Sequence, residues 1–177
     1  MAKTIAPEDK LANAALKLLT KTVWSDLALS HVAKAAKIPL AQLPVRAKPA
    51  LIGIILTKLG DETAKRYRPD AEGSARDRVF EAAMSWFDAA SPHKDAMRAL
   101  YQGLKRDPLS LLAAREDFVK AGSWLLTLAE ADTGPAIPLR ALALAGAMAR
   151  SFSTWLDDGP DLAKTMAKLD GDLRRAF

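Results

Sequence analysis

The chain has 177 residues, enough for one sizeable core or for a small unit beside a larger one. Half of the residues are apolar and 27% are charged, as in ordinary globular proteins, and the absence of cysteine excludes disulfides and thiolate chemistry. No apolar run reaches the ~18 residues of a membrane-spanning helix, and residues 1–10 lack the apolar core of a signal peptide. We therefore expect a soluble, cytoplasmic protein without integral membrane association.

Positive charge is concentrated in the N-terminal part. Residues 1–70 hold 12 Lys and Arg against 6 Asp and Glu, whereas residues 71–177 hold 14 against 15. Between Lys10 and Lys58, eight basic residues face one acidic residue, Asp26. This distribution is typical of a module that binds a polyanion, although a solvated lysine-rich surface explains it equally well.

Proline, glycine and capping residues divide the first part of the chain into short helices. Apolar spacing predicts helices over residues 7–20, 27–36 and 49–67, with a brief helical stretch over 40–47 that Pro44 interrupts. Pro49 suits the first turn of the long helix, since its missing N–H would be unpaired there anyway.

Longer helices follow. Ser74 is a candidate N-cap, and both Ser91-Pro92 and Asp107-Pro108 pair a capping side chain with a proline at the first helical position. The predicted helices cover residues 74–90, begin at Pro92 and Pro108, and cover 138–156; a last helix follows the turn 158–160 and ends near Phe177. Because no alternating strand pattern appears, we predict an all-α fold of about nine helices. The loop 68–73 separates a predicted first domain, residues 1–67, from a second, residues 74–177.

Residues 11–59 carry a recognisable order of motifs: a helix (LANAALKLL), a break (TVW), a short helix (LALSHVAKAAKIP), a second short helix, and a proline-started helix (PALIGIIL). This order resembles the N-terminal domain of the TetR family. Val32-Ala33 matches the step where two helices cross closely, Ile38 the apolar turn residue, and Leu43 the leucine that anchors the recognition helix. The resemblance implies a helix-turn-helix three-helix unit, followed by a helical ligand-binding and dimerisation domain. It therefore implies a one-component transcriptional regulator.

Three positions depart from the family pattern. Lys37 replaces the turn glycine, Pro44 replaces a tyrosine that contacts phosphate, and Ala47 replaces an aromatic residue. The candidates left to contact bases or phosphates of DNA are Lys34, Lys37, Gln42, Arg46 and Lys48. Gln42 is suited to adenine and Arg46 to guanine, although both also suit a solvated surface.

Two further segments, RDRVFEAAMSWFDAASPHKDAMRAL and STWLDDGPDLAKTMAKLDGDLRRAF, resemble a TetR-like branch. That branch includes the lipid-binding accessory protein of ubiquinone biosynthesis, and its members have lost DNA recognition and hold an apolar lipid. The alternative function is therefore a non-DNA-binding lipid- or isoprenoid-binding protein, accessory to ubiquinone biosynthesis.

Large apolar side chains in the second domain are candidates to line a site for an apolar or amphipathic small molecule or lipid, although each also suits an ordinary core. They are Met84, Trp86, Phe87, Met97, Tyr101, Phe118, Trp124, Met148, Phe152 and Trp155.

Closely spaced small residues over 141–149 favour the approach of a neighbouring helix, either within the chain or in a second copy. In the TetR family the last two helices form the dimer interface. This resemblance assigns to a homodimer interface Gly146, Arg150, Leu162, Met166 and Leu169.

Catalytic motifs are missing from the sequence. It has no glycine-rich phosphate loop and no HExxH, and AGSWL lacks the second glycine of a nucleophile elbow. His31 and His93 lie far apart, and neither has a spaced carboxylate partner. We therefore expect no enzymatic activity, no metal and no cofactor.

Overall fold

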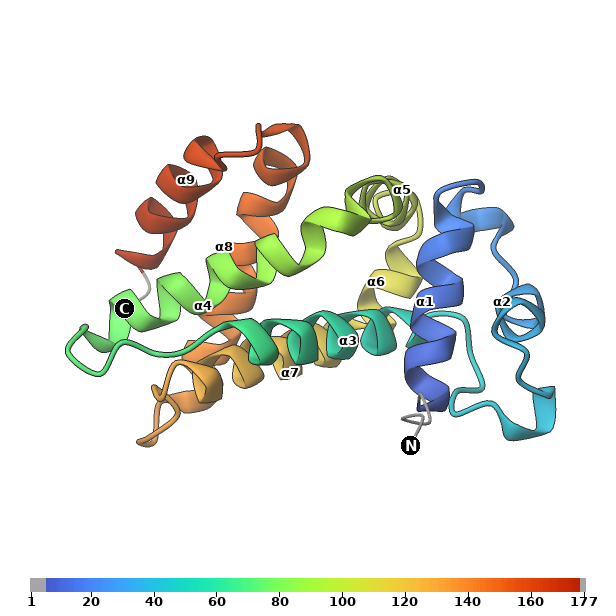
Figure 1. Cartoon of the computed structure of the whole chain (residues 1–177), viewed down its shortest axis with the longest axis horizontal. Coiled ribbons are helices and arrows are strands. Elements are labelled where there is room, and N and C mark those ends of the chain that lie inside the picture. Colours follow the sequence, from blue (N-terminus) through green and yellow to red (C-terminus); the bar gives the residue numbers. More distant parts are fainter. Residues whose placement is uncertain (1–5, 176–177) are drawn as a thin grey trace. The chain divides into compact units, whose positions relative to one another are not determined.

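The computed structural model describes residues 6–175, and within that range it contains helices and turns but no strand (Figure 1). The all-α prediction is confirmed. The α-helices are α1 (Pro7–Leu19), α2 (Leu29–Ala36), α3 (Ala50–Arg66), α4 (Ala75–Ala90), α5 (Lys94–Leu104), α6 (Pro108–Ala113), α7 (Arg115–Leu128), α8 (Ile137–Asp157) and α9 (Ala163–Leu173). Three 3-10 turns are η1 (Trp24–Asp26), η2 (Leu40–Gln42) and η3 (Ser91–His93).

Two predicted helix starts are confirmed by their hydrogen bonds. The Ser74 hydroxyl accepts from the Asp77 N–H at 3.2 Å, and Asp107 Oδ1 accepts from the Ser110 N–H at 3.0 Å. Each cap satisfies a backbone donor that has no partner inside the helix.

The helix predicted from Pro108 onward is two helices. Ala114 ends α6, and α7 begins at Arg115 with Glu116 and Asp117 in its first turn. Acidic side chains there interact favourably with the positive end of the helix dipole. The last helix is also shorter than predicted, since α9 ends at Leu173; residues 176–177 lie outside the described range.

The chain forms two compact units. Unit 1 consists of Met1–Lys58 with His93–Asp117, and unit 2 of Leu59–Pro92 with Phe118–Phe177. Loop 68–73 lies within unit 2 and does not divide the two units. The boundary between the two predicted domains at this loop therefore stays a prediction. No helix in the described range is both long and apolar enough to cross a membrane.

Within unit 1, α1 packs against α2 and α5. The buried face of α1 includes Leu11, Ala15 and Leu19. Trp24 of η1 is also buried in this unit. Within unit 2, α9 packs on α8 and α4, and the fully buried residues include Phe87, Leu125, Leu144 and Trp155. Each unit therefore has a core of its own.

Candidate nucleic-acid interface and ligand site

The end of α2 takes the form of a helix stop that normally requires glycine. Lys37 adopts the left-handed conformation, with φ 57° and ψ 40°. Its N–H donates to the Lys34 carbonyl, and the Ile38 N–H donates to the Ala33 carbonyl at 3.0 Å. This pair of bonds is the usual closure of a helix C-terminus, but a side chain in this conformation is strained where glycine is not. The helix-turn-helix turn is therefore present, with a strained lysine at its corner.

The brief helical stretch predicted over residues 40–47, with its interruption at Pro44, is shorter than predicted. The chain forms only η2, and Leu43 is already extended, with φ −64° and ψ 132°. Pro44 explains the shortening, because a residue preceding proline avoids the helical conformation and proline itself has no N–H to donate. Leu43 is nevertheless buried, as its predicted anchoring role requires.

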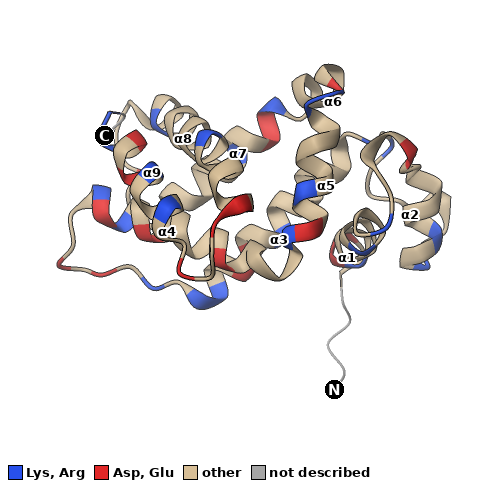
Figure 2. Cartoon of the chain, turned by 90° about the horizontal axis from the view of Figure 1, so that it is seen from above, with Lys and Arg blue, Asp and Glu red and all other residues tan. Residues whose placement is uncertain are grey.

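The exposed candidates for DNA contact are Lys34, Lys37, Gln42 and Arg46. The Arg46 guanidinium donates to the Leu40 carbonyl at 3.3 Å, which holds its side chain against η2. Gln42, the last residue of η2, lies on a 3-10 turn instead of a regular helix face. Figure 2 shows basic positions along α2 and the turn that follows it.

Lys48 differs from the other four candidates. Its ammonium donates to the Trp24 carbonyl at 3.0 Å and lies 4.8 Å from the centre of the Trp24 ring. Both interactions are favourable, and together they hold the cation inside unit 1. Lys48 therefore stabilises the packing around Trp24, a role that its place in the sequence does not indicate.

The two units differ in net charge. Unit 1 carries 14 Lys and Arg against 7 Asp and Glu, whereas unit 2 carries 12 against 14. From Leu27 to Gly60 the sequence contains no acidic residue. Unit 1 is thus the cationic part of the molecule, and it includes the helix-turn-helix segment.

The predicted ligand-site residues lie in both units. Met97 and Tyr101 belong to α5 in unit 1, and the other eight belong to unit 2. Within unit 2, Trp86 and Phe87 of α4 and Phe152 and Trp155 of α8 form one aromatic cluster. The ring centroids are 5.5 Å apart for Trp86–Phe87 and for Phe87–Trp155, 5.1 Å for Phe152–Trp155, and 6.5 Å for Trp86–Phe152.

Ser151 is a polar residue that the sequence does not single out. It is fully buried on α8, next to Phe152 of the cluster, and its hydroxyl has no hydrogen-bond partner among the described residues. A buried hydroxyl without a partner is costly, which makes it a candidate anchor for a polar group of a ligand. No sequence signal marks it, because serine is mostly exposed in proteins and its burial here depends on tertiary packing.

The predicted dimer residues differ in their exposure. Leu162 and Leu169 are buried inside the chain, Met166 is partly exposed, and Gly146 is half-buried. Arg150 forms an ion pair with Asp172 of α9, with Nε 3.3 Å from Oδ2. Burial alone would raise the pKa of Asp172, but the hydrogen bond from Lys168 and the charge of Arg150 lower it overall.

No family model and no curated protein matches the sequence. A solved structure does match: the crystal structure of the TetR transcriptional regulator from Nitrosomonas europaea ATCC 19718, with a TM-score of 0.68 and 18% sequence identity. The match covers 97% of this chain and 98% of that one. The chain therefore has the fold of this TetR transcriptional regulator over nearly its whole length.

Proposed function

We propose that this protein is a TetR-type one-component transcriptional regulator that binds DNA through unit 1, binds an apolar small molecule in unit 2, and acts as a homodimer. A fold alone does not select a function. The observation that carries the proposal is that this fold places its excess positive charge in the unit with the helix-turn-helix segment.

On this proposal, the affinity for DNA comes more from basic side chains that pair with phosphates than from contacts with base edges. Lys34, Lys37 and Arg46 are exposed, and neutralising phosphates releases counterions whatever the base sequence is. Because η2 is only three residues long, the chain lacks a helix that would enter the major groove in the usual way. We therefore expect weak or narrow sequence preference, with Gln42 and Arg46 as its source.

The ligand site is proposed at the aromatic cluster of unit 2. Its four rings provide the apolar surface that such sites use, and the Ser151 hydroxyl next to Phe152 supplies a polar group in need of a partner. The expected ligand is therefore largely apolar, with at least one hydrogen-bonding group.

The homodimer is proposed along α8. Residues 139, 142, 146, 149 and 153 follow the three-and-four spacing of a helix-pairing seam, and none of them is buried. Leu139 and Leu142 are 68% and 56% exposed. In an antiparallel pair centred near Gly146, Leu142 faces Ala149 and Leu139 faces Ser153, so large side chains meet small ones. The seam is thus complementary to a second copy of itself.

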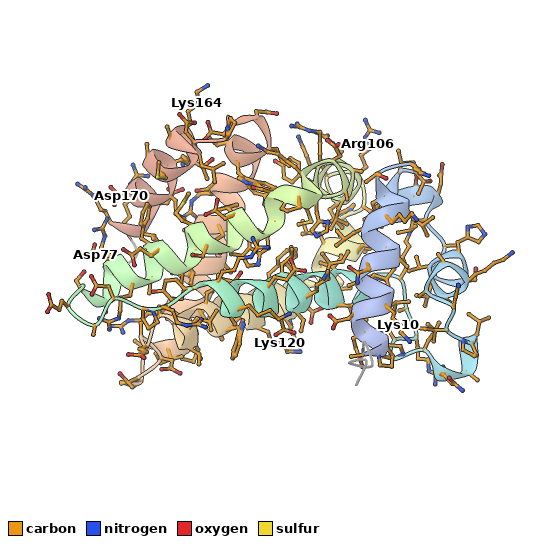
Figure 3. The ribbon with its side chains drawn as sticks, viewed as in Figure 1. Lys10, Asp77, Arg106, Lys120, Lys164 and Asp170 are labelled. Carbon is orange, nitrogen blue, oxygen red and sulfur yellow. The ribbon has the colours of Figure 1, made fainter. Side chains whose placement is uncertain are left out.

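The DNA part of the proposal is tested with charge variants. Lys34→Gln combined with Lys37→Gln removes two exposed cations of unit 1, while Lys164→Gln removes one from the surface of α9 in unit 2 (Figure 3). Duplex binding is measured by fluorescence anisotropy over a range of salt concentrations. We expect the double variant to lower the log–log salt slope by about 0.9 for each phosphate that it no longer neutralises, and the control to leave the slope unchanged.

The shortening of the recognition helix to the three-residue η2 is the observation that favours the second candidate, a lipid- or isoprenoid-binding protein that does not bind DNA. Equal salt slopes for the wild type and the unit 1 variant would contradict the regulator proposal. Native mass spectrometry of the purified protein then tests the alternative, which requires a co-purifying lipid of defined mass.

A further inference from the structure

Helix α6 exposes its apolar residues and buries its polar one. Leu109, Leu112 and Leu111 are 77%, 61% and 45% exposed, while Ser110 is only 6% exposed. Soluble proteins normally show the opposite pattern, and contiguous exposed leucines mark a surface that meets a protein or a membrane.

Interactions on its buried side hold α6 in this orientation. Asp107 caps the helix through the Ser110 N–H, and its other carboxylate oxygen accepts from the indole N–H of buried Trp24 at 3.0 Å. Gly103, just before the cap, lies against Trp24 so closely that a side chain there would collide with it. In Figure 2, α6 lies at the outer edge of unit 1, on the far side of α5 from α1. The leucines are therefore held outward by a packed anchor.

Cations flank these leucines on both sides in the sequence. Lys105 and Arg106 precede α6, Arg115 follows it, and all three are exposed. Figure 3 shows Arg106 at the surface beyond the end of α5. The nearby acids are Asp107, which is engaged by Trp24 and Ser110; Asp117, whose carboxylate lies against Gly53; and Glu116, which is exposed. Formal charge over residues 105–117 is balanced, but among the exposed charged side chains there three are basic and only Glu116 is acidic.

We propose that α6 docks on an anionic lipid bilayer. The three leucines enter the boundary between headgroups and acyl chains, while Lys105, Arg106 and Arg115 meet lipid phosphates. A bilayer is favoured because it satisfies both features: DNA would pair with the cations and leave the leucines in water. A stable interface with a second copy of the chain would need to bury roughly 800 Å² of surface on each partner, and one short helix offers far less.

Vesicle binding of the full chain tests this proposal with two variants of matched exposure. Leu112→Ser changes a leucine of α6 that is 61% exposed, and Leu40→Ser changes one of η2 that is 58% exposed. We expect binding to vesicles with about 30 mol% phosphatidylglycerol, none to pure phosphatidylcholine, and a loss of about tenfold for Leu112→Ser only. Arg106→Gln should weaken binding by about fivefold, the usual share of one cation near an anionic surface.

Three results would overturn the proposal: equal binding to both vesicle types, equal effects of Leu112→Ser and Leu40→Ser, or a lower sedimentation mass of Leu112→Ser at micromolar concentration. The last would show that α6 contacts a second copy. Circular dichroism and thermal unfolding confirm that both variants fold. Leu112→Ser is expected to keep the DNA salt slope of the wild type, so the outcome for lipid binding is independent of the outcome for the regulator proposal.

Discussion

The indole N–H of Trp24 donates a hydrogen bond to Oδ2 of Asp107 at 3.0 Å, across 83 positions of sequence. The same carboxylate caps α6, and Lys48 donates to the carbonyl of the same tryptophan. Trp24 and these two charged side chains therefore form one cluster within unit 1. This cluster links η1, the segment before α3 and the start of α6.

Replacing Asp107 by Asn tests this link through its pH dependence. Asparagine keeps one acceptor where the carboxylate offers two, so Asp107→Asn should lower stability at pH 7. The hydrogen bonds from Ser110, followed by that from Trp24, lower the pKa of Asp107 from its ordinary value of 3.8. The stability that the carboxylate contributes is therefore present above pH 3.8 and disappears as the pH falls through the lower native pKa.

Urea midpoints of the wild type and Asp107→Asn at pH 7, 5 and 3 provide the measurement. The difference between the two proteins should be largest at pH 7 and shrink at pH 3. Asp158 and Asp172, whose pKa values are also lowered, are common to both proteins and cancel in the comparison. A difference that stays constant over this range would show that the charge of Asp107 contributes nothing.

Lys37→Gly should stabilise the protein by about 1 kcal/mol, because glycine adopts the left-handed conformation without strain. Lys34→Gly is the matched control, since it removes a lysine three positions earlier inside α2 and should destabilise by about 1 kcal/mol. Both variants lose one positive charge, so a charge effect would shift them in the same direction. Urea unfolding distinguishes the two outcomes.

Ser151→Ala should raise stability by about 1 kcal/mol, because it removes a buried hydroxyl that has no partner among the described residues. If Ser151 anchors a ligand, the same change weakens ligand binding. Ser153→Ala, at an exposed position of α8, should change neither quantity. Thermal unfolding with and without a co-purified apolar ligand measures both effects, and a loss of stability in Ser151→Ala would contradict the assignment of an unpaired hydroxyl.

The α8 seam predicts that Leu142→Arg converts a dimer into monomers, because it places charges opposite Ala149 of the second copy. Leu109→Arg introduces the same charge at an exposed leucine of unit 1 and should leave the mass unchanged. Sedimentation velocity at micromolar concentration measures both. A monomeric wild-type protein would refute the seam directly.

The sequence predicted most helices because their start signals are local. Ser74 and Asp107 cap the helices that their sequence indicated, and Leu43 is buried as expected. Pro44 limits the second helix of the motif to the single turn η2, so its interruption lies earlier in the chain than the sequence pattern indicates. The notable tertiary features were not predictable, since the interactions of Lys48 and Asp107 with Trp24 join residues distant in sequence. The same holds for α6, because which face of so short a helix is buried depends on the packing of Trp24.

DNA selection is the most direct test of the regulator proposal. The purified wild-type protein is incubated with fragments of its own genome at physiological salt, and the bound fragments are sequenced. We predict enrichment of a few fragments above nonspecific background, reduced in Lys34→Gln with Lys37→Gln and retained in Lys164→Gln. Recovery of no fragment above background from the wild-type protein would contradict the proposal.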